Sequence, residues 1–177
     1  MATAFSSGAT VCEVRALPFA PMSPTLRQPP PAGWTLASPE DTWYPGALRR
    51  LRLVHPDPER RARGVLVWVR GSRFGLPLGA GRFVGLVPGG LYQYVGIDDL
   101  SGEDCEAWAL THRSPTAKSQ AELVFDWQAP DTGVDGSLVV RAFLIEDCDP
   151  QAGVCRDAQA LTPFLELREA LFAEGFE

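Results

Sequence analysis

Two apolar stretches with a period of two constrain the fold more than any other part of the sequence. In residues 122–127, the apolar side chains of Leu123, Phe125 and Trp127 alternate with Glu122, Val124 and Asp126. Because successive side chains of a β-strand point to opposite faces, this pattern predicts a half-buried antiparallel strand. Residues 136–145 alternate in the same way, but both of their faces are mostly apolar. We expect this second strand to be central or covered on both faces.

A turn separates these two strands. Pro130 cannot donate to a strand ladder, and Gly133 tolerates a positive φ. Two long strands joined in this way can bury their faces only against an opposing sheet. Upstream, residues 47–54 alternate again, and residues 64–70 form a nearly continuous apolar run that predicts a central strand. Turn signals recur about every ten residues from there to residue 145, so the sequence predicts an all-β fold, an antiparallel β-sandwich.

The end of the chain has a different pattern. Thr162 followed by Pro163 matches the start of a helix, and Gly175 stands where a helix C-terminus places glycine. The residues between them offer an apolar side: Phe164, Leu165, Leu167, Leu171 and Phe172. We expect a short C-terminal helix that docks on the sandwich or on a partner, because so short a helix is marginal in water alone. We therefore divide the chain into a sandwich domain (1–146) and an extension with a disulfide loop and a helix (147–177).

The chain has four cysteines, which allow three pairings: Cys12, Cys105, Cys148 and Cys155. Cys148 and Cys155 bracket a short loop whose Pro150 and Gly153 would let the chain reverse and close a bridge. Cys12 and Cys105 would then pair across most of the domain. The alternative is four reduced, buried thiols in a cytosolic protein. Disulfides would indicate an exported chain.

Charge and hydropathy exclude several classes of partner. The net charge of −6 and the pI near 5.0 argue against nucleic acid and anionic membrane surfaces. The sequence contains no run of eighteen apolar residues, so we expect no membrane span. The first eight residues lack the basic start and apolar core of a signal peptide, and we expect one to have been removed. Abundant Gly, Pro and Arg with a single Lys suit a GC-rich bacterial genome.

Few residues suggest catalysis. His112, near Ser114 and Ser119, is the candidate general base, but no Gly-x-Ser-x-Gly elbow accompanies it, and we favour a loop histidine packed under a turn. The acidic pairs Asp98-Asp99 and Glu103-Asp104 could act on a glycoside only if a cleft brought two carboxylates together, so we favour a solvated loop. We predict no catalytic residue.

Metal and ligand sites are equally hard to find. His55 and His112 are the only histidines, Cys148 and Cys155 lack the spacing of zinc ligands, and residues 147–153 match a calcium loop poorly. We predict no metal and no cofactor. One or two of the five tryptophans, if exposed beside Tyr92 and Tyr94, could form a contact patch for sugar or protein.

The chain resembles the reeler domain, an extracellular module, over about residues 5–146. The residues that carry the resemblance are, in chain order, Gly8-Ala9, Cys12, Tyr44-Pro45-Gly46, Arg63-Gly64-Val65-Leu66, Gly81-Arg82-Phe83, Cys105, Thr111-His112, Lys118, Phe125-Asp126-Trp127-Gln128-Ala129-Pro130 and Gly133. The resemblance implies an immunoglobulin-like β-sandwich, and Cys12–Cys105 looks like the family's disulfide. The Cys148–Cys155 loop and the helix look like additions to the family pattern.

From the resemblance we expect a secreted or cell-surface module that binds or adheres without catalysis. Its partner would be an extracellular protein or a glycan, and no binding residue can be assigned. The alternative is a structural subunit that assembles with its own kind into a surface filament or complex, through the proline-rich N-terminal segment or the C-terminal helix. An enzyme accessory domain or a weak metal binder is a further alternative.

Overall fold

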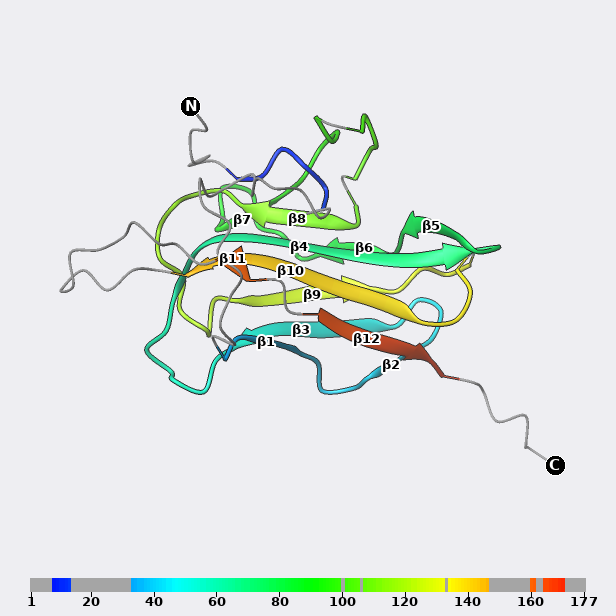
Figure 1. Cartoon of the computed structure of the whole chain (residues 1–177), viewed down its shortest axis with the longest axis horizontal. Coiled ribbons are helices and arrows are strands. Elements are labelled where there is room, and N and C mark those ends of the chain that lie inside the picture. Colours follow the sequence, from blue (N-terminus) through cyan, green and yellow to red (C-terminus); the bar gives the residue numbers. More distant parts are fainter. Residues whose placement is uncertain are drawn as a thin grey trace.

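The computed structural model describes residues 8–13, 33–99, 101–105, 107–132, 134–146, 160–161 and 164–170, and these residues form an all-β structure (Figure 1). Its strands are β1 (Thr35–Ala37), β2 (Thr42–Trp43), β3 (Leu48–Val54), β4 (Ala62–Arg73), β5 (Leu76–Gly79), β6 (Arg82–Val84), β7 (Tyr92–Tyr94), β8 (Ala109–His112), β9 (Val124–Gln128), β10 (Leu138–Glu146), β11 (Ala160–Leu161) and β12 (Phe164–Glu169).

The strands form two sheets. One has the order β1-β3-β9-β6, and the other has the order β2-β12-β10-β4-β8-β7, with β5 paired to β4 and β11 paired to β10. All strand pairs are antiparallel except β12 and β2, which run parallel. The strands of both sheets run in nearly the same direction in Figure 1, as in aligned sandwiches. The predicted β-sandwich is confirmed.

The main core lies between the two sheets. Leu123, Phe125 and Trp127 point into it from β9 and the residue before it, as their alternation predicts. Leu51 of β3 and Val67 of β4 are fully buried in the same cluster. The period of two in the sequence therefore identified the inner face of each of these strands correctly.

A second core covers the outer face of the larger sheet. Leu66 and Trp68 of β4 and Phe143 of β10 are buried there, away from the first core. Residues 8–13 and the segment around Cys105 lie over them and complete the cluster. In Figure 1 residues 8–13 are the blue segment beside β8. Because both of their faces are covered, β4 and β10 are apolar on both sides, and the prediction that they are central strands is confirmed.

The predicted C-terminal helix is wrong. Residues 164–169 form β12, which pairs antiparallel with β10, and the structure shows no helix in the residues it describes. Leu165 and Leu167 alternate with Glu166 and Arg168, a period of two that suits a strand, and Leu167 is fully buried in the main core. The hydrogen-bonding groups of β10 on this side need partners, and pairing with them outweighs a helix that is marginal alone.

The division of the chain after residue 146 stays a prediction. The strand β12 follows that boundary in sequence but belongs to the same sheet as β10. The expected helix start at Thr162 and Pro163 lies outside the described residues, as do Gly175, Leu171 and Phe172.

Lys118, the only lysine, is fully buried beside the start of β4. Its ammonium group donates to the carbonyl oxygens of Arg63 (2.8 Å), Ser114 (2.9 Å) and Thr116 (2.8 Å). These bonds tie the loop after β8 to the start of β4. Burial lowers the pKa of Lys118 to about 8, and the nearby carboxylate of Glu122 opposes this shift.

We expect Lys118 to make stability rise with pH in alkaline solution. Because the lysine of the unfolded chain keeps the ordinary pKa of 10.5, the folded chain binds fewer protons between pH 8 and that value. The free energy of unfolding relative to a Lys118→Met variant should therefore increase over this interval and level off below it. Urea unfolding of both proteins at several pH values measures the difference, which removes the contribution of every other titrating group. A difference that falls as the pH rises would contradict the lowered pKa.

Candidate functional site

The disulfide between Cys12 and Cys105 is present, as predicted, and joins residues 93 positions apart in the sequence. Both cysteines are fully buried in the second core. The backbone N–H of Cys12 donates to the carboxylate of Asp98 (2.8 Å), and the N–H of Cys105 donates to the carbonyl of Gly96 (3.2 Å). The bridge therefore fastens residues 8–13 to the segment that precedes β8. Cys148 and Cys155 lie outside the described residues.

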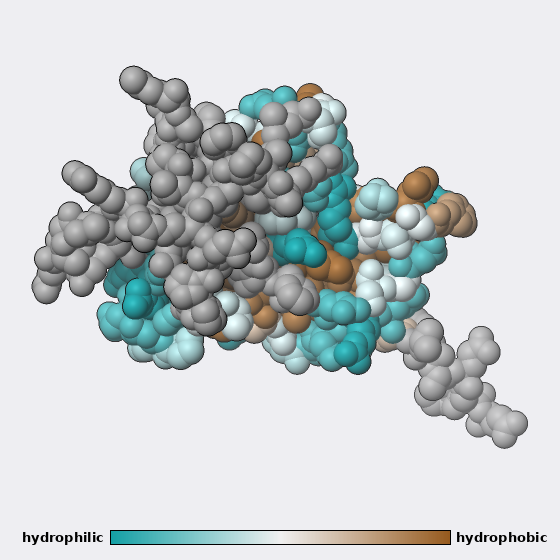
Figure 2. All heavy atoms as spheres, in the orientation of Figure 1, coloured by the Kyte–Doolittle hydropathy of each residue, from teal (hydrophilic) through white to brown (hydrophobic). Residues whose placement is uncertain are grey.

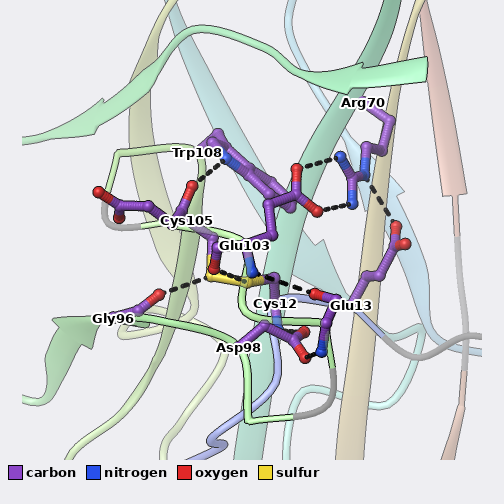
Figure 3. The surroundings of a disulfide bond; sticks show 10 residues. Cys12, Glu13, Arg70, Gly96, Asp98, Glu103, Cys105 and Trp108 are labelled. Carbon is purple, nitrogen blue, oxygen red and sulfur yellow. Dashed lines mark hydrogen bonds and ion pairs between the residues drawn. A yellow bond between two sulfur atoms is a disulfide. The ribbon is translucent and has the colours of Figure 1, made fainter. Parts of the chain in front are cut away.

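Arg70 of β4 holds the same two segments together from the surface of the sheet (Figure 3). Its Nε donates to Glu13 (2.9 Å), and its two terminal nitrogens donate to the two carboxylate oxygens of Glu103 (2.9 Å each). The guanidinium carbon lies 4.1 Å from the centre of the Trp108 ring. We call Arg70, Glu13, Glu103 and Trp108 the arginine clamp.

The arginine clamp sets one positive charge between two carboxylates. Burial disfavours the charged guanidinium, but its hydrogen bonds to Glu103 and Glu13 and the charges of these two carboxylates together outweigh burial and hold the pKa of Arg70 above its ordinary value. The forked contact with Glu103 is the geometry in which arginine binds a carboxylate most strongly. The clamp and the disulfide together keep the cover of the second core in place, which is a structural task.

The predicted catalytic candidates have structural partners. His112 lies in β8 rather than in a loop, is almost fully buried, and accepts the N–H of Val65 at its Nδ1 (3.1 Å). Asp98 accepts the N–H groups of Cys12 and Ser101, and Glu103 binds Arg70. The backbones of the two acidic pairs do lie side by side, because the N–H of Asp98 donates to the carbonyl of Glu103 (2.8 Å) and Ile97 pairs with Asp104. The carboxylates of Asp98 and Glu103 nevertheless hold backbone groups and Arg70, which are structural tasks.

The prediction that one or two tryptophans are exposed beside Tyr92 and Tyr94 is wrong. All five are buried: Trp34, Trp43, Trp68, Trp108 and Trp127. Each indole ring has a large apolar surface that packs into one of the two cores. Tyr94 is exposed, but its hydroxyl donates to the carbonyl of Phe83 (2.8 Å) and so bridges β7 to β6.

The described part of the chain holds no group of three or more His, Cys, Asp or Glu side chains placed to bind a metal ion. The weak calcium-loop pattern at residues 147–153 lies outside the described residues. Within the described ranges, no helix is long and apolar enough to cross a membrane.

A hollow that the sequence did not reveal opens at one edge of the sandwich. β6 and β7 are edge strands of the two sheets, and residues 85–91 carry the chain from one sheet to the other. The hollow there has a volume of about 210 Å³. Aliphatic side chains form most of its lining: Val84, Leu86, Val87, Leu91, Leu110 and Val124. We call it the edge hollow.

Two aromatic rings and one carboxylate complete the edge hollow. Tyr92 and Phe125 meet edge to face with ring centres 5.0 Å apart. The hydroxyl of Tyr92 donates to the carbonyl of Glu122 (2.7 Å), and burial raises the pKa of Tyr92. Asp126 is the acidic residue of the lining, and its carboxylate also binds Arg50 (2.8 Å). The hollow therefore suits an apolar group, and its one carboxylate is already paired with an arginine.

The size of the edge hollow limits what it can hold. A cavity of about 150 Å³ accommodates a benzene molecule, so this hollow has room for one side chain rather than for a large ligand. The sequence did contain a signal for it: Leu86, Val87 and Leu91 are apolar residues around a turn, Pro88-Gly89-Gly90, where polar residues are usual.

The fold is similar to that of solved reeler domains. The crystal structure of the human F-spondin reeler domain (fragment 1) matches with a TM-score of 0.52 and 21% identity, over 78% of this chain and 88% of that one. Fragment 2 of the same human domain matches with a TM-score of 0.51 and 20% identity, over 78% and 93%. The Reelin-N domain of F-spondin matches with a TM-score of 0.53 and 18% identity, over 82% and 93%.

Neither a family model nor a curated protein matches the sequence. The solved structures therefore carry the comparison, and at such low identity they bear on the fold alone. The resemblance seen in the sequence is confirmed at this level: the chain has a reeler-domain-like fold.

We expect the arginine clamp to contribute strongly to stability. An Arg70→Met substitution removes the guanidinium that two partly buried carboxylates share and should lower the free energy of unfolding by about 2 kcal/mol, between the values typical of exposed and buried pairs. Arg70→Lys should lie between wild type and Arg70→Met, because an ammonium group cannot reproduce the fork. Urea unfolding with the disulfide intact measures both.

Arg50→Met is the matched control, because it removes an arginine whose ion pair with Asp126 is solvent-exposed. Its effect should be much smaller than that of Arg70→Met. Equal effects of the two substitutions would show that the clamp adds nothing beyond a surface ion pair.

Proposed function

We propose that this chain is an exported binding module that takes an apolar side chain of a partner protein into its edge hollow. The reeler-domain-like fold is the premise, and the edge hollow is the observation that carries the proposal. Small apolar recesses that receive one anchoring side chain are typical of protein interfaces. The aliphatic lining favours a protein partner over a glycan, which would need more polar groups for its hydroxyls.

The proposal does not include catalysis. Its support is that His112, Asp98 and Glu103 are engaged in holding the fold. The proposal does include adhesion at a cell surface or in a matrix. It also includes an immunoglobulin-like type of sandwich, and the two stacked, mostly antiparallel sheets are the support for that part.

Export rests on the Cys12–Cys105 disulfide, since such bonds persist in oxidising compartments. When the protein is recovered from its own host and unfolded in denaturant, which exposes these buried side chains, we expect both cysteines to react with an alkylating reagent only after reduction. Intact-mass and peptide-mass measurements before and after reduction decide this. Alkylation of Cys12 and Cys105 without prior reduction would contradict export.

Binding at the edge hollow can be tested with toluene, a probe the size of a phenylalanine side chain. In amide NMR spectra of the labelled protein, toluene should shift resonances of residues 84–92 and 124–126 and few others. Val87→Asp should weaken this binding at least tenfold, because it places a charge in the apolar lining. Val87 is largely exposed, so the substitution should leave the fold intact.

Leu48→Asp is the matched control: it adds the same charge at another exposed apolar position outside the hollow. Toluene should bind this variant as it binds wild type. Toluene binding that Val87→Asp leaves unchanged, or shifts spread over the whole molecule, would refute the proposed site.

A further inference from the structure

The turn between β4 and β5 projects apolar side chains into solvent. Phe74 is 84% exposed and Leu76 is 70% exposed, the two highest values among the large exposed apolar residues of the described part of the chain. In Figure 2 brown, apolar atoms protrude at the right-hand end of the molecule, where Figure 1 places this turn. We call Arg73, Phe74, Gly75 and Leu76 the hairpin tip.

The backbone of the hairpin tip is unusual for its sequence. Arg73 pairs with Leu76, so Phe74 and Gly75 form a two-residue turn, and both have positive φ, 53° and 77°. Asn-Gly is the common sequence for such turns, because asparagine tolerates the left-handed conformation. A bulky residue there strains the backbone by about 1 kcal/mol or more. Phe74 is therefore a poor choice for the turn itself, which points to a use for its exposed ring.

Neighbouring groups fix the hairpin tip in place. The N–H of Phe74 donates to the carboxylate of Asp135 (3.0 Å), and the N–H of Asp135 donates to the carbonyl of Ser72 (2.8 Å). The guanidinium of Arg73 lies 5.3 Å from the centre of the Phe74 ring. The backbone of the tip is thus fixed before any partner binds, which reduces the entropy lost on association.

We propose that the hairpin tip of one copy of the chain inserts into the edge hollow of a second copy. This inference rests on the proposed function, because it names the occupant of the same hollow. Phe74 supplies the apolar group, and a phenyl ring fits within 210 Å³.

Charge supports this choice of partner. Arg73 directly precedes Phe74, and Asp126 belongs to the lining of the edge hollow, so insertion brings a second arginine to a carboxylate that already binds Arg50. Each carboxylate oxygen has two acceptor sites, so Asp126 can accept from both arginines. With a net charge of −6, two copies repel one another in general. A contact that brings Arg73 to the Asp126 carboxylate places an attractive pairing where the copies meet.

The hairpin tip cannot fill the hollow of its own chain. Leu110 of the lining pairs with Val67 of β4, and Phe74 follows Val67 by seven residues along the same extended strand. At about 3.3 Å per residue this places Phe74 roughly 23 Å from the level of the hollow. Occupation by Phe74 therefore requires another molecule.

Such a contact is heterologous, since it joins different surfaces of the two copies. Each molecule in contact keeps one free tip or one free hollow, so the contact repeats and builds an open chain or a ring. One tip in one hollow buries far less than the roughly 1,200 Å² of a stable interface. The association is therefore weak unless other segments add to it, and NMR at high protein concentration is the suitable method.

Two complementary variants test the pairing. Phe74→Asp removes the tip and keeps the hollow, and it suits the turn better than phenylalanine, because aspartate is enriched in the left-handed region. Val87→Asp impairs the hollow and keeps the tip. Labelled Phe74→Asp mixed with unlabelled Val87→Asp should show shifts at residues 84–92 and 124–126. With the labels exchanged, the shifts should move to residues 73–76.

The unlabelled double variant Phe74→Asp/Val87→Asp is the control, and it should produce no shift in labelled Phe74→Asp. Absence of shifts in the complementary mixture, or equal shifts with the double variant, overturns the inference. If toluene still shifts the hollow resonances in that case, the proposed function stands and only the identity of the occupant is refuted. If toluene also leaves them unchanged, the proposed function itself is refuted.

Discussion

The burial of β4 and β10 on both faces is the constraint on which the rest of the structure depends. These two strands form the centre of the larger sheet, and they place Val67 and Val140 against the smaller sheet and Leu66 and Phe143 on the outer side. A sheet that is apolar on both sides must be covered twice. The smaller sheet supplies one cover. Residues 8–13 and the segment before β8 supply the other, although neither segment has regular strands of its own that pair into the sheet.

That second cover explains why the disulfide and the arginine clamp occur together. An irregular cover lacks the ladder hydrogen bonds that hold a strand in a sheet, so it needs other attachments. The Cys12–Cys105 bridge joins its two segments covalently, and Arg70 binds one carboxylate from each of them. In the simple chain-entropy model, a bridge that closes a loop of this length stabilises the fold by about 4–5 kcal/mol, less any strain. The polar residues that looked like a possible active site thus act as fasteners.

The two surfaces proposed for binding arise where this architecture ends. The sandwich is open beside β6 and β7, because the last strands of the two sheets are joined there by a Gly- and Pro-rich loop rather than by hydrogen bonds along a ladder. The hairpin tip arises because β4 continues past its neighbours and is accompanied only by β5. One surface is hollow and mostly apolar, and the other protrudes and carries an arginine beside an exposed aromatic ring. Because the two surfaces lie apart within one chain, they can meet only when two chains associate.

The sequence by itself determined the class of the fold, the central strands and the partly buried strand before Pro130, because a period of two or an apolar run reports directly which faces are buried. It also indicated the Cys12–Cys105 pair through its resemblance to reeler domains. It could not determine the state of residues 164–169, since their apolar residues fit one side of a helix as well as one face of a strand, and only the free side of β10 decided between them. Tertiary structure alone decided the edge hollow and the roles of Arg70 and Phe74. Each of them depends on which residues far apart in sequence come into contact once the two sheets have packed.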